Sequence, residues 1–282
     1  MNKVEKKVPF SEDYWKEDGG QRWADMIDAT ENSISVFDDK LFEKASISEG
    51  EIVLDVGCGG GTTSIEIAQR VTANGHVTGL DISVPILNIA RQRGKAFSNL
   101  EFEEADAADF NPGSEVYDLI FSRFGLMFFS KPVDAFSNLK AMLKQSGRIV
   151  FLCWRTFDEN PWMKEPAEAV FKVIPPQGPA PGPDAPGPFS LGDRGKIENI
   201  MNQAGYKAME IEAIDINLEI GNLEETVNFF TRMGPAASLI AEADEDRKQA
   251  AITSLTESLR DYETAAGVSM PGAAWIVSAI NK

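Results

Sequence analysis

A glycine-rich segment preceded by a carboxylate is the strongest chemical signal in the sequence. Residues 53–61 read VLDVGCGGG, so Asp55 stands two residues before Gly57, and glycine recurs at Gly59 and Gly61. Glycine permits a sharp turn after a strand and lets a ligand approach the main chain. Dinucleotide-binding turns instead have the spacing G-x-G-x-x-G and hold pyrophosphate at a helix N-terminus. A carboxylate there would repel pyrophosphate, so Asp55 favours a cationic amino-acid ligand, bound directly or through water.

Two further acids follow the next two predicted strands. Asp81 ends the segment 76–81, and Asp106 comes two residues after the segment 100–104. Open α/β sheets bind ligands beyond the carboxyl ends of their parallel strands. There Asp81 could accept hydrogen bonds from both hydroxyls of a ribose, and Asp106 from an adenine amino group. One such acid alone would more simply cap a helix, but three in this order predict a shared nucleoside site.

The elements that would position these acids alternate between short apolar strands and amphipathic helices. Such alternation predicts parallel strands joined by right-handed crossovers, with helices on both faces of the sheet. We therefore predict an α/β fold that is Rossmann-like: a doubly wound, mostly parallel seven-stranded sheet, with N-terminal helices and a helical cap inserted before the last strand. The predicted strands are 51–56, 76–80, 100–104, 116–122 and 148–154, and the predicted helices between them are 62–71, 84–93 and 132–144.

The flanking regions divide the chain into three parts within one structural unit. Residues 1–50 are predicted to form an N-terminal helical lid, residues 51–220 with 265–282 the ligand-binding domain, and residues 221–264 a helical cap that sets substrate specificity. The proline-rich stretch 175–188 must be a loop or extended segment. The remaining predicted elements are helices 193–204, 223–232 and 241–262 and strands 206–217 and 274–279.

Composition excludes several classes of function. The net charge of −17 disfavours nucleic acid as a partner, and the basic segments 3–7 and 91–95 are interpreted as solvated faces. His76 is the only histidine, so a multi-histidine metal site is excluded and no metal is expected. Because His76 begins a predicted strand, we expect it at the edge of the sheet opposite the ligand. Two distant cysteines, with neither a signal peptide nor a membrane span in the sequence, predict a cytoplasmic protein.

Residues 51–155 resemble the class I methyltransferases that use S-adenosylmethionine (SAM), and in particular the branch that methylates ubiquinone, menaquinone and other small molecules. The resemblance implies SAM as the methyl donor and S-adenosylhomocysteine (SAH) as the product. It assigns the glycine turn to the methionine part of SAM, the second acid to the ribose, the third to the adenine, and the segment after the fourth strand to the reactive methyl group. The implied cofactor-binding residues are Asp55, Gly57, Cys58, Gly59, Thr62, Asp81, Ile82, Asp106, Ala107 and Ser122.

Four other side chains have alternative interpretations. Arg123 either orients an anionic acceptor as the catalytic residue or forms a structural ion pair. Tyr14 and Trp23 either close over SAM or fasten a helix to the core. Cys58 occupies a turn position that needs a small residue and is not expected to be a nucleophile.

The predicted function is methyl transfer from SAM to a small-molecule acceptor by in-line displacement, in which the protein orients the reactants and excludes water. One alternative is a SAM-binding protein without methyl transfer, such as a regulatory subunit or a SAM-bound cyclase. A nucleic-acid methyltransferase is disfavoured by the acidic charge and by the sequence FSRF at residues 121–124. A nicotinamide dehydrogenase is contradicted by the glycine spacing. The acceptor and the oligomeric state, a homodimer included, stay open.

Overall fold

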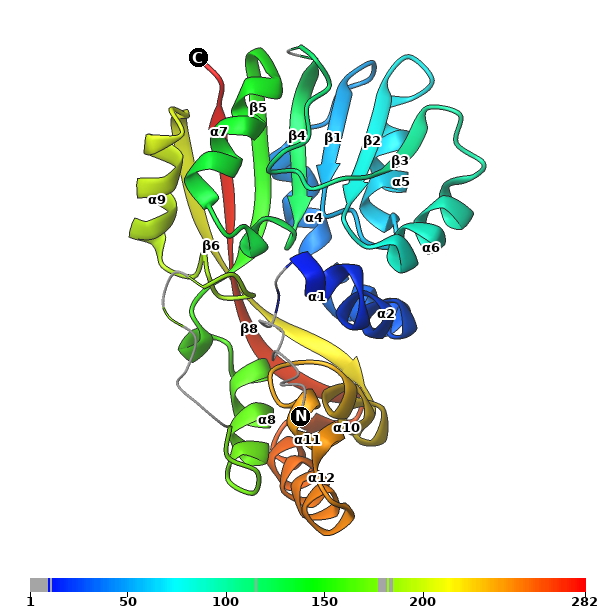
Figure 1. The fold of residues 1–282 in the computed structure, drawn as a ribbon, viewed down its shortest axis with the longest axis vertical. Helices are drawn as coiled ribbons and strands as arrows, with labels where there is room; N and C mark the ends of the chain where they lie inside the picture. The colour runs from blue at the N-terminus through cyan, green and yellow to red at the C-terminus, as the bar shows by residue number, and fades with distance from the viewer. Residues whose placement is uncertain (1–9, 11, 115, 177–181, 183–184) are drawn as a thin grey trace, which may run out of the picture.

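The computed structural model describes residues 10, 12–114, 116–176, 182 and 185–282 (Figure 1). The basic segment 3–7 and part of the proline-rich stretch 175–188 lie outside the described residues. Within the predicted N-terminal helical region 1–50, the described residues are mostly helical. The elements of this region are α1 (Glu12–Lys16), α2 (Asp18–Asp25), α3 (Ile27–Ile34), the 3₁₀ turn η1 (Ser35–Phe37) and α4 (Asp38–Ala45).

One mixed sheet forms the centre of the molecule, and its strand order is β3-β2-β1-β4-β5-β8-β6. Strands β1 to β5 run parallel, and β8 pairs antiparallel with both β5 and β6. The predicted Rossmann-like, mostly parallel sheet is therefore confirmed, with a short hairpin strand, β7, added beside β8. The strands are β1 (Ile52–Val56), β2 (His76–Asp81), β3 (Leu100–Glu104), β4 (Tyr117–Arg123), β5 (Leu143–Trp154), β6 (Lys207–Gly221), β7 (Glu263–Thr264) and β8 (Gly267–Ile280).

The chain reverses its direction of winding between β1 and β4, which are neighbours in the sheet. Helices α5 (Thr62–Val71) and α6 (Val84–Gly94) connect β1 to β2 and β2 to β3, whereas α7 (Pro132–Met142) connects β4 to β5. In Figure 1, α4 and α5 lie behind the sheet and α7 in front of it. Layers on both faces explain why the central strands are mostly apolar. The reversal also marks the edge where such sheets bind ligands.

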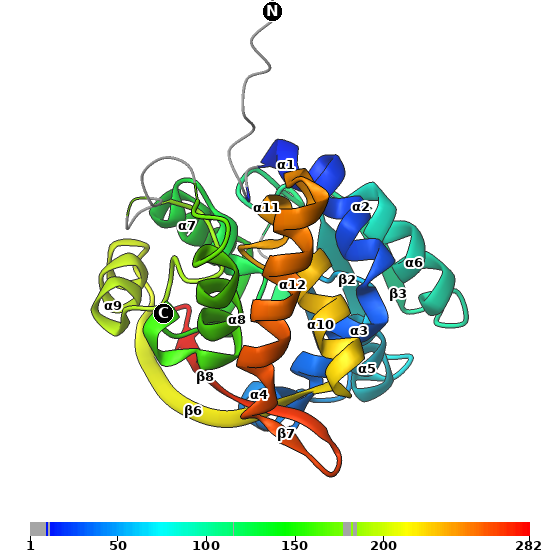
Figure 2. The ribbon, with the colours of Figure 1, turned by 90° about the horizontal axis from the view of Figure 1, so that it is seen from below.

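Strands β6 and β8 are longer than the sequence pattern predicted. Trp154, the last residue of β5, pairs with Ala274, whereas β6 and β8 continue to pair as far as Gly221 and Val268. This two-stranded extension leaves the central sheet and carries the helical cap at its end (Figures 1 and 2). Pro271 lies within the extension, and a proline without an N–H argues against a strand in sequence-based prediction. The cap contains α10 (Leu223–Arg232), α11 (Ala237–Glu242) and α12 (Glu245–Arg260).

Helix α8 (Pro161–Phe171) was not predicted, and it packs against α12 of the cap. The buried Asn160 precedes it and donates hydrogen bonds to the carbonyl oxygens of Arg155, Thr156 and Ala273 at 3.0–3.3 Å. Asn160 thereby fixes the segment after β5 to β8. Pro161 starts the helix without losing an intrahelical hydrogen bond. The remaining elements are η2 (Leu126–Phe128), η3 (Phe157–Glu159) and α9 (Arg194–Gln203).

Two further boundaries differ from prediction, one in the sheet and one in the cap. Strand β5 begins at Leu143 and runs through Gly147, whereas the glycine suggested a helix end before residue 148. The predicted helix 241–262 is interrupted before Glu245, where Asp244 caps α12 by accepting a hydrogen bond from the amide of Arg247 at 3.0 Å. Across the described ranges, no helix has the length and apolar character needed to span a membrane.

Candidate functional site

The glycine turn connects β1 to α5 and has a backbone that only glycine adopts readily. Gly57, Gly59 and Gly61 have φ angles of +68°, +55° and +82°. A Cβ atom on Gly57 would lie 2.7 Å from the Cα of Gly125, so the turn packs tightly against the segment after β4. A Cβ atom on Gly59 would meet only the Oε1 of Glu31, at 3.9 Å. Gly59 is therefore the open point of the turn, where a ligand can approach the main chain.

Asp55 lies beneath this turn and is completely buried. Its Oδ2 accepts hydrogen bonds from Thr63 Oγ1 at 2.7 Å and Ser64 Oγ at 2.6 Å. Its Oδ1 is buried and has no hydrogen-bond partner. Burial raises the pKa of Asp55 to about 6, although the two hydroxyls and Arg123 act in the opposite direction. An unpartnered buried acceptor is costly, and an ammonium or a water bound to one would supply the missing donor.

Asp81 ends β2 and is fixed against the glycine turn. Its Oδ2 accepts a hydrogen bond from the amide of Gly59 at 3.0 Å, and its Oδ1 accepts one from the amide of Ser83 at 2.9 Å. Burial raises the pKa of Asp81, and the backbone hydrogen bonds oppose this rise. A carboxylate oxygen has two lone pairs, so each oxygen can accept one further hydrogen bond, as a pair of ribose hydroxyls would require.

Asp106 lies beside Asp81 in the adjoining loop. The amide of Ala105 donates to the carbonyl oxygen of Asp81 at 3.1 Å, which joins the end of β3 to the end of β2. Asp106 Oδ1 accepts a hydrogen bond from the amide of Ala108 at 2.8 Å, and Ala107 between them is buried. The structure therefore brings the three predicted acids to the carboxyl ends of three neighbouring strands.

The segment after β4 closes the opposite side of the glycine turn. Ser122 Oγ donates to the carbonyl oxygen of Val56 at 2.7 Å and accepts a hydrogen bond from the amide of Gly125 at 3.2 Å. Phe124 has a φ angle of +61°, which is strained for an aromatic residue, and its ring stacks on Trp154 with centroids 4.0 Å apart. These contacts give Ser122 a bracing role in the turn.

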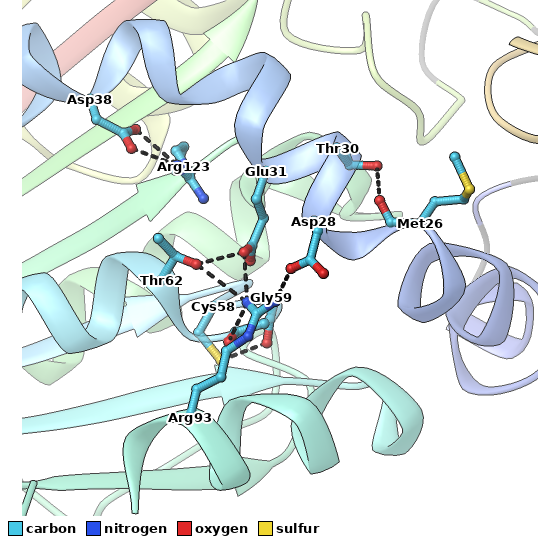
Figure 3. A network of polar contacts seen from close by, with 11 residues as sticks. Met26, Asp28, Thr30, Glu31, Asp38, Cys58, Gly59, Thr62, Arg93 and Arg123 are labelled. Atoms are coloured by element: carbon cyan, nitrogen blue, oxygen red, sulfur yellow. Dashed lines mark hydrogen bonds and ion pairs between the residues drawn. The ribbon is translucent and has the colours of Figure 1, made fainter. Parts of the chain in front are cut away.

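Arg123 forms a buried ion pair with Asp38 at the start of α4. Its Nη1 lies 2.9 Å from Asp38 Oδ1 and 2.7 Å from Oδ2 (Figure 3). Burial raises the pKa of Asp38, and Arg123 opposes the rise. Of the two interpretations of Arg123, this contact matches the structural ion pair, and it fastens the N-terminal helices to the ligand edge of the sheet.

Helix α3 covers the glycine turn through residues that sequence reasoning missed. Glu31 Oε2 accepts hydrogen bonds from Thr62 Oγ1 at 2.5 Å and Arg93 Nη1 at 2.7 Å, and Arg93 Nη2 lies 2.6 Å from Asp28 Oδ1 (Figure 3). The interpretation of segment 91–95 as a solvated face is therefore wrong for Arg93. The sequence pattern of α3 and α6 does not distinguish Asp28, Glu31 and Arg93 from surface charges. The reason is that Arg93 lies more than 60 residues from Asp28 and Glu31 in the sequence.

The N-terminal aromatic residues pack on the segment after β4. The ring of Trp15 lies 5.1 Å from that of Phe128 and 5.6 Å from that of Trp23, and Tyr14 lies 5.3 Å from Trp15. This cluster matches the interpretation that Tyr14 and Trp23 fasten a helix to the core. A direct contact of either ring with SAM stays a prediction.

His76 and Cys58 lie where the sequence placed them. His76 is at the start of β2, the end opposite the glycine turn, and its Nε2 is 3.0 Å from Glu101 Oε1. Cys58 is buried, and burial raises the pKa of its thiol well above the ordinary value, so the thiolate is disfavoured. Among the described residues, no three His, Cys, Asp or Glu side chains are grouped so that they could hold a metal ion.

One open groove of the described residues lies away from this turn. It has a volume of about 410 Å³ and is lined by charged residues of α8, including Lys164, Glu165 and Glu168, with Ser258 of α12 on its other side. These charges are mixed in sign and lie on or next to α8, which packs against the cap, away from the three acids. The groove therefore gives no support to a second site, and the glycine turn remains the candidate site beneath α3.

Comparison with known proteins agrees with this geometry. A family model described as a methyltransferase domain matches residues 47–216. The demethylmenaquinone methyltransferase of Staphylococcus haemolyticus (strain JCSC1435) is 26% identical over 207 residues, which cover 68% of this chain and 86% of that protein. Phosphoethanolamine N-methyltransferase 1 of Arabidopsis thaliana is 31% identical over 112 residues, 39% of this chain and 22% of that protein.

Solved structures show the same fold. A methyltransferase structure from Bacillus halodurans superposes with a TM-score of 0.57 at 17% identity, over 86% of this chain and 97% of that chain. Phosphoethanolamine N-methyltransferase 2 of Haemonchus contortus, in complex with SAM, superposes with a TM-score of 0.59 at 16% identity, over 98% of this chain and 60% of that chain.

Proposed function

Because this chain belongs to the methyltransferase-domain family, the class I SAM-dependent methyltransferases, we propose that it transfers the methyl group of SAM to a small-molecule acceptor. The observation that carries the proposal is the position of Asp81, whose carboxylate accepts the amide of Gly59 at the open point of the glycine turn. The buried, partnerless Oδ1 of Asp55 adds an acceptor for a cationic ligand. A turn for the methionine part and an acid for the ribose thus stand side by side.

Each part of SAM has proposed partners in this site. Asp55, Gly57, Cys58, Gly59 and Thr62 would hold the methionine part, with Cys58 acting through its backbone. Asp81 would accept the ribose hydroxyls, Ile82 would lie beside the adenine, and Asp106 with Ala107 would bind the adenine edge. Ser122 would stabilise the glycine turn without contacting SAM, because its hydroxyl donates a hydrogen bond to the carbonyl oxygen of Val56.

When bound, SAM would supply an electrophilic methyl group: a nucleophilic atom of the acceptor would form a bond to the methyl carbon in line with the breaking bond from sulfur to carbon, and SAH would leave. The protein's part is to orient and to exclude water. The segment after β4, in which Phe124 stacks on Trp154, would form a rigid apolar wall next to the methyl group of bound SAM. Arg123 would support this wall indirectly. Its guanidinium forms an ion pair with Asp38 and so fastens the N-terminal helices to the sheet. No general base is assigned.

The domain roles follow from the same arrangement. We propose that residues 1–50 form the lid, that residues 51–220 with 265–282 hold SAM, and that the helical insertion 221–264 contributes to acceptor binding. Acceptor candidates come from the relatives, whose names specify demethylmenaquinone and phosphoethanolamine. A quinol-type ring and a primary amine are therefore the first two acceptor classes to test.

Calorimetric titration of the protein with SAM, SAH and NAD tests the cofactor. Binding of SAM and SAH without binding of NAD is expected, and binding of NAD alone would overturn the proposal. The acceptor is tested by measuring SAH release with a demethylated quinol, with phosphoethanolamine and then with a fractionated metabolite extract. SAM binding without SAH release in any fraction would favour a SAM-binding protein that transfers no methyl group.

A further inference from the structure

We infer that Arg93 is a positioning residue that holds helix α3 over the glycine turn and thereby sets the lifetime of bound cofactor. The inference rests on the proposed function, because it assigns cofactor binding to that turn. Arg93 belongs to α6, whereas the groups that it contacts belong to α3 and to the turn before α5. One side chain thus connects three elements around the site (Figure 3).

The contacts of Arg93 divide between the lid and the turn. Toward α3, its Nη1 donates to Glu31 Oε2 at 2.7 Å and its Nη2 to Asp28 Oδ1 at 2.6 Å. Toward the turn, its Nη1 donates to the carbonyl oxygen of Gly60 at 3.1 Å and lies 3.4 Å from Thr62 Oγ1. The guanidinium is a planar fork with five donors, so it can reach two carboxylates and a carbonyl at once. A lysine ammonium cannot span the same set.

Arg93 also stabilises the position of α3 by compensating the charge of Glu31. Glu31 is only 9% exposed and lies over the glycine turn, which is also close to two other acids, the buried Asp55 in β1 and the partly buried Asp81 at the end of β2. Without Arg93, the carboxylate of Glu31 would be buried without a compensating charge, which is strongly unfavourable. Helix α3 would then move toward solvent to hydrate Glu31. Arg93 therefore acts on the site through the position of α3, and not through contact with the reacting atoms.

The sequence around the turn is adapted to this contact. A Cβ atom on Gly60 would lie 2.6 Å from Arg93 Nη1, 2.7 Å from Glu31 Oε1 and 2.9 Å from Ile27 Cγ1. A larger residue at position 60 would displace the side-chain ends of Arg93 and Glu31 and so disturb the contact between them. Glycine at position 60 leaves room for the Arg93–Glu31 contact, whereas glycine at position 59 suits a backbone with a φ angle of +55°.

The test compares Arg93→Ala with Arg91→Ala. Arg91 is an exposed residue of the same helix, and its Nη2 donates to the carbonyl oxygen of Phe102 at 3.3 Å, so its loss removes equal charge without touching α3. Two readouts are used: the Kd and dissociation rate of SAM and SAH by stopped-flow fluorescence, and amide hydrogen exchange of residues 27–34 in the ligand-free protein. For Arg93→Ala we expect an increase of about 10-fold in the Kd of both ligands, mainly from faster dissociation, and faster exchange. Arg91→Ala should change neither.

Three further variants test the inference independently. Arg93→Gln, which retains two N–H donors, serves if Arg93→Ala does not fold, and Arg93→Lys should recover only part of the affinity. In the background of Asp28→Asn with Glu31→Gln, Arg93→Ala should have little further effect on either readout, because its carboxylate partners are gone. Equal behaviour of the Arg93 and Arg91 variants in both readouts would overturn the inference. Hydrogen exchange needs no SAM, so failure of the wild-type protein to bind SAM would reject the proposed function separately.

Discussion

The Oδ2 atom of Asp81 lies 3.0 Å from the amide nitrogen of Gly59, so the carboxylate that ends β2 is fixed against the turn that ends β1. The two residues are 22 positions apart in sequence. Parallel pairing of β1 with β2 brings them together, because it aligns the carboxyl ends of both strands at one edge. Any ligand that contacts the open side of Gly59 therefore also meets a carboxylate that can accept hydroxyl groups.

Asp81→Ala should weaken SAM binding without unfolding the protein. The variant removes hydrogen bonds to a charged group, which are worth about 1–3 kcal/mol in binding free energy. Calorimetric titration with SAM gives the loss directly. The control is Asp109→Ala, which changes an exposed aspartate of the next turn. Equal affinities of the two variants would remove Asp81 from the ribose site.

The stability of the protein should depend on pH through Asp55. Burial raises the pKa of this group from 3.8 to about 6 in the folded state. Below pH 3.8, Asp55 is protonated in both the folded and the unfolded protein. As the pH rises from there to 6, the unfolded chain ionises Asp55 first, so the free energy of unfolding falls by roughly 3 kcal/mol and stays lower at higher pH.

Comparison of wild type with Asp55→Asn isolates this contribution. Other buried acids titrate in both proteins, and their effects cancel in the difference. Urea unfolding measured at intervals between pH 4 and 7 should show that the wild type loses stability relative to the variant as the pH rises toward 6, with no further relative change above it. A difference that is constant across this range would show that Asp55 ionises normally.

The ion pair of Arg123 with Asp38 should be mainly structural. Arg123→Ala leaves a mostly buried carboxylate unpaired, which should cost about 3 kcal/mol in the free energy of unfolding. The double variant Arg123→Met with Asp38→Leu removes both charges and should recover most of that loss in urea unfolding. If methyl transfer recovers together with stability, Arg123 has no role in orienting the acceptor. A stable double variant with slow turnover at saturating SAM would instead assign Arg123 to the acceptor site.

Gly59→Ala should separate cofactor binding from folding. The left-handed backbone at Gly59 costs an alanine about 1–2 kcal/mol, and its Cβ would meet only Glu31 Oε1 at 3.9 Å, so the protein should fold. The added methyl group would occupy the open side of the turn, so SAM binding should fall sharply in calorimetric titration. Gly113→Ala is the matched control, because Gly113 has a φ angle of +90° and nothing lies within 4 Å of its added Cβ. Equal SAM affinity in both variants would place the ligand elsewhere.

The sequence alone determined the central fold and the order of the three acids. Strands and crossover helices in residues 51–154 each have a local signal, since apolar runs end at glycine or at an acid. Right-handed crossovers and adjacent neighbours then leave only a handful of ways to assemble them. The carboxyl ends of β1, β2 and β3 had to meet at one edge, and so Asp55, Asp81 and Asp106 had to meet with them.

The tertiary structure decided what covers that edge. Arg91 and Arg93 look alike in sequence, two basic residues of one amphipathic helix, but only Arg93 faces α3 and finds Glu31 and Asp28. Arg123 could pair with an acceptor or with an acid, and the packing of α4 supplied Asp38. The extension of β6 and β8 was likewise hidden, because pairing between distant strands overrides the local preference of Pro271 and its neighbours. Contacts between segments far apart in sequence have no local pattern, so only the folded chain reveals them.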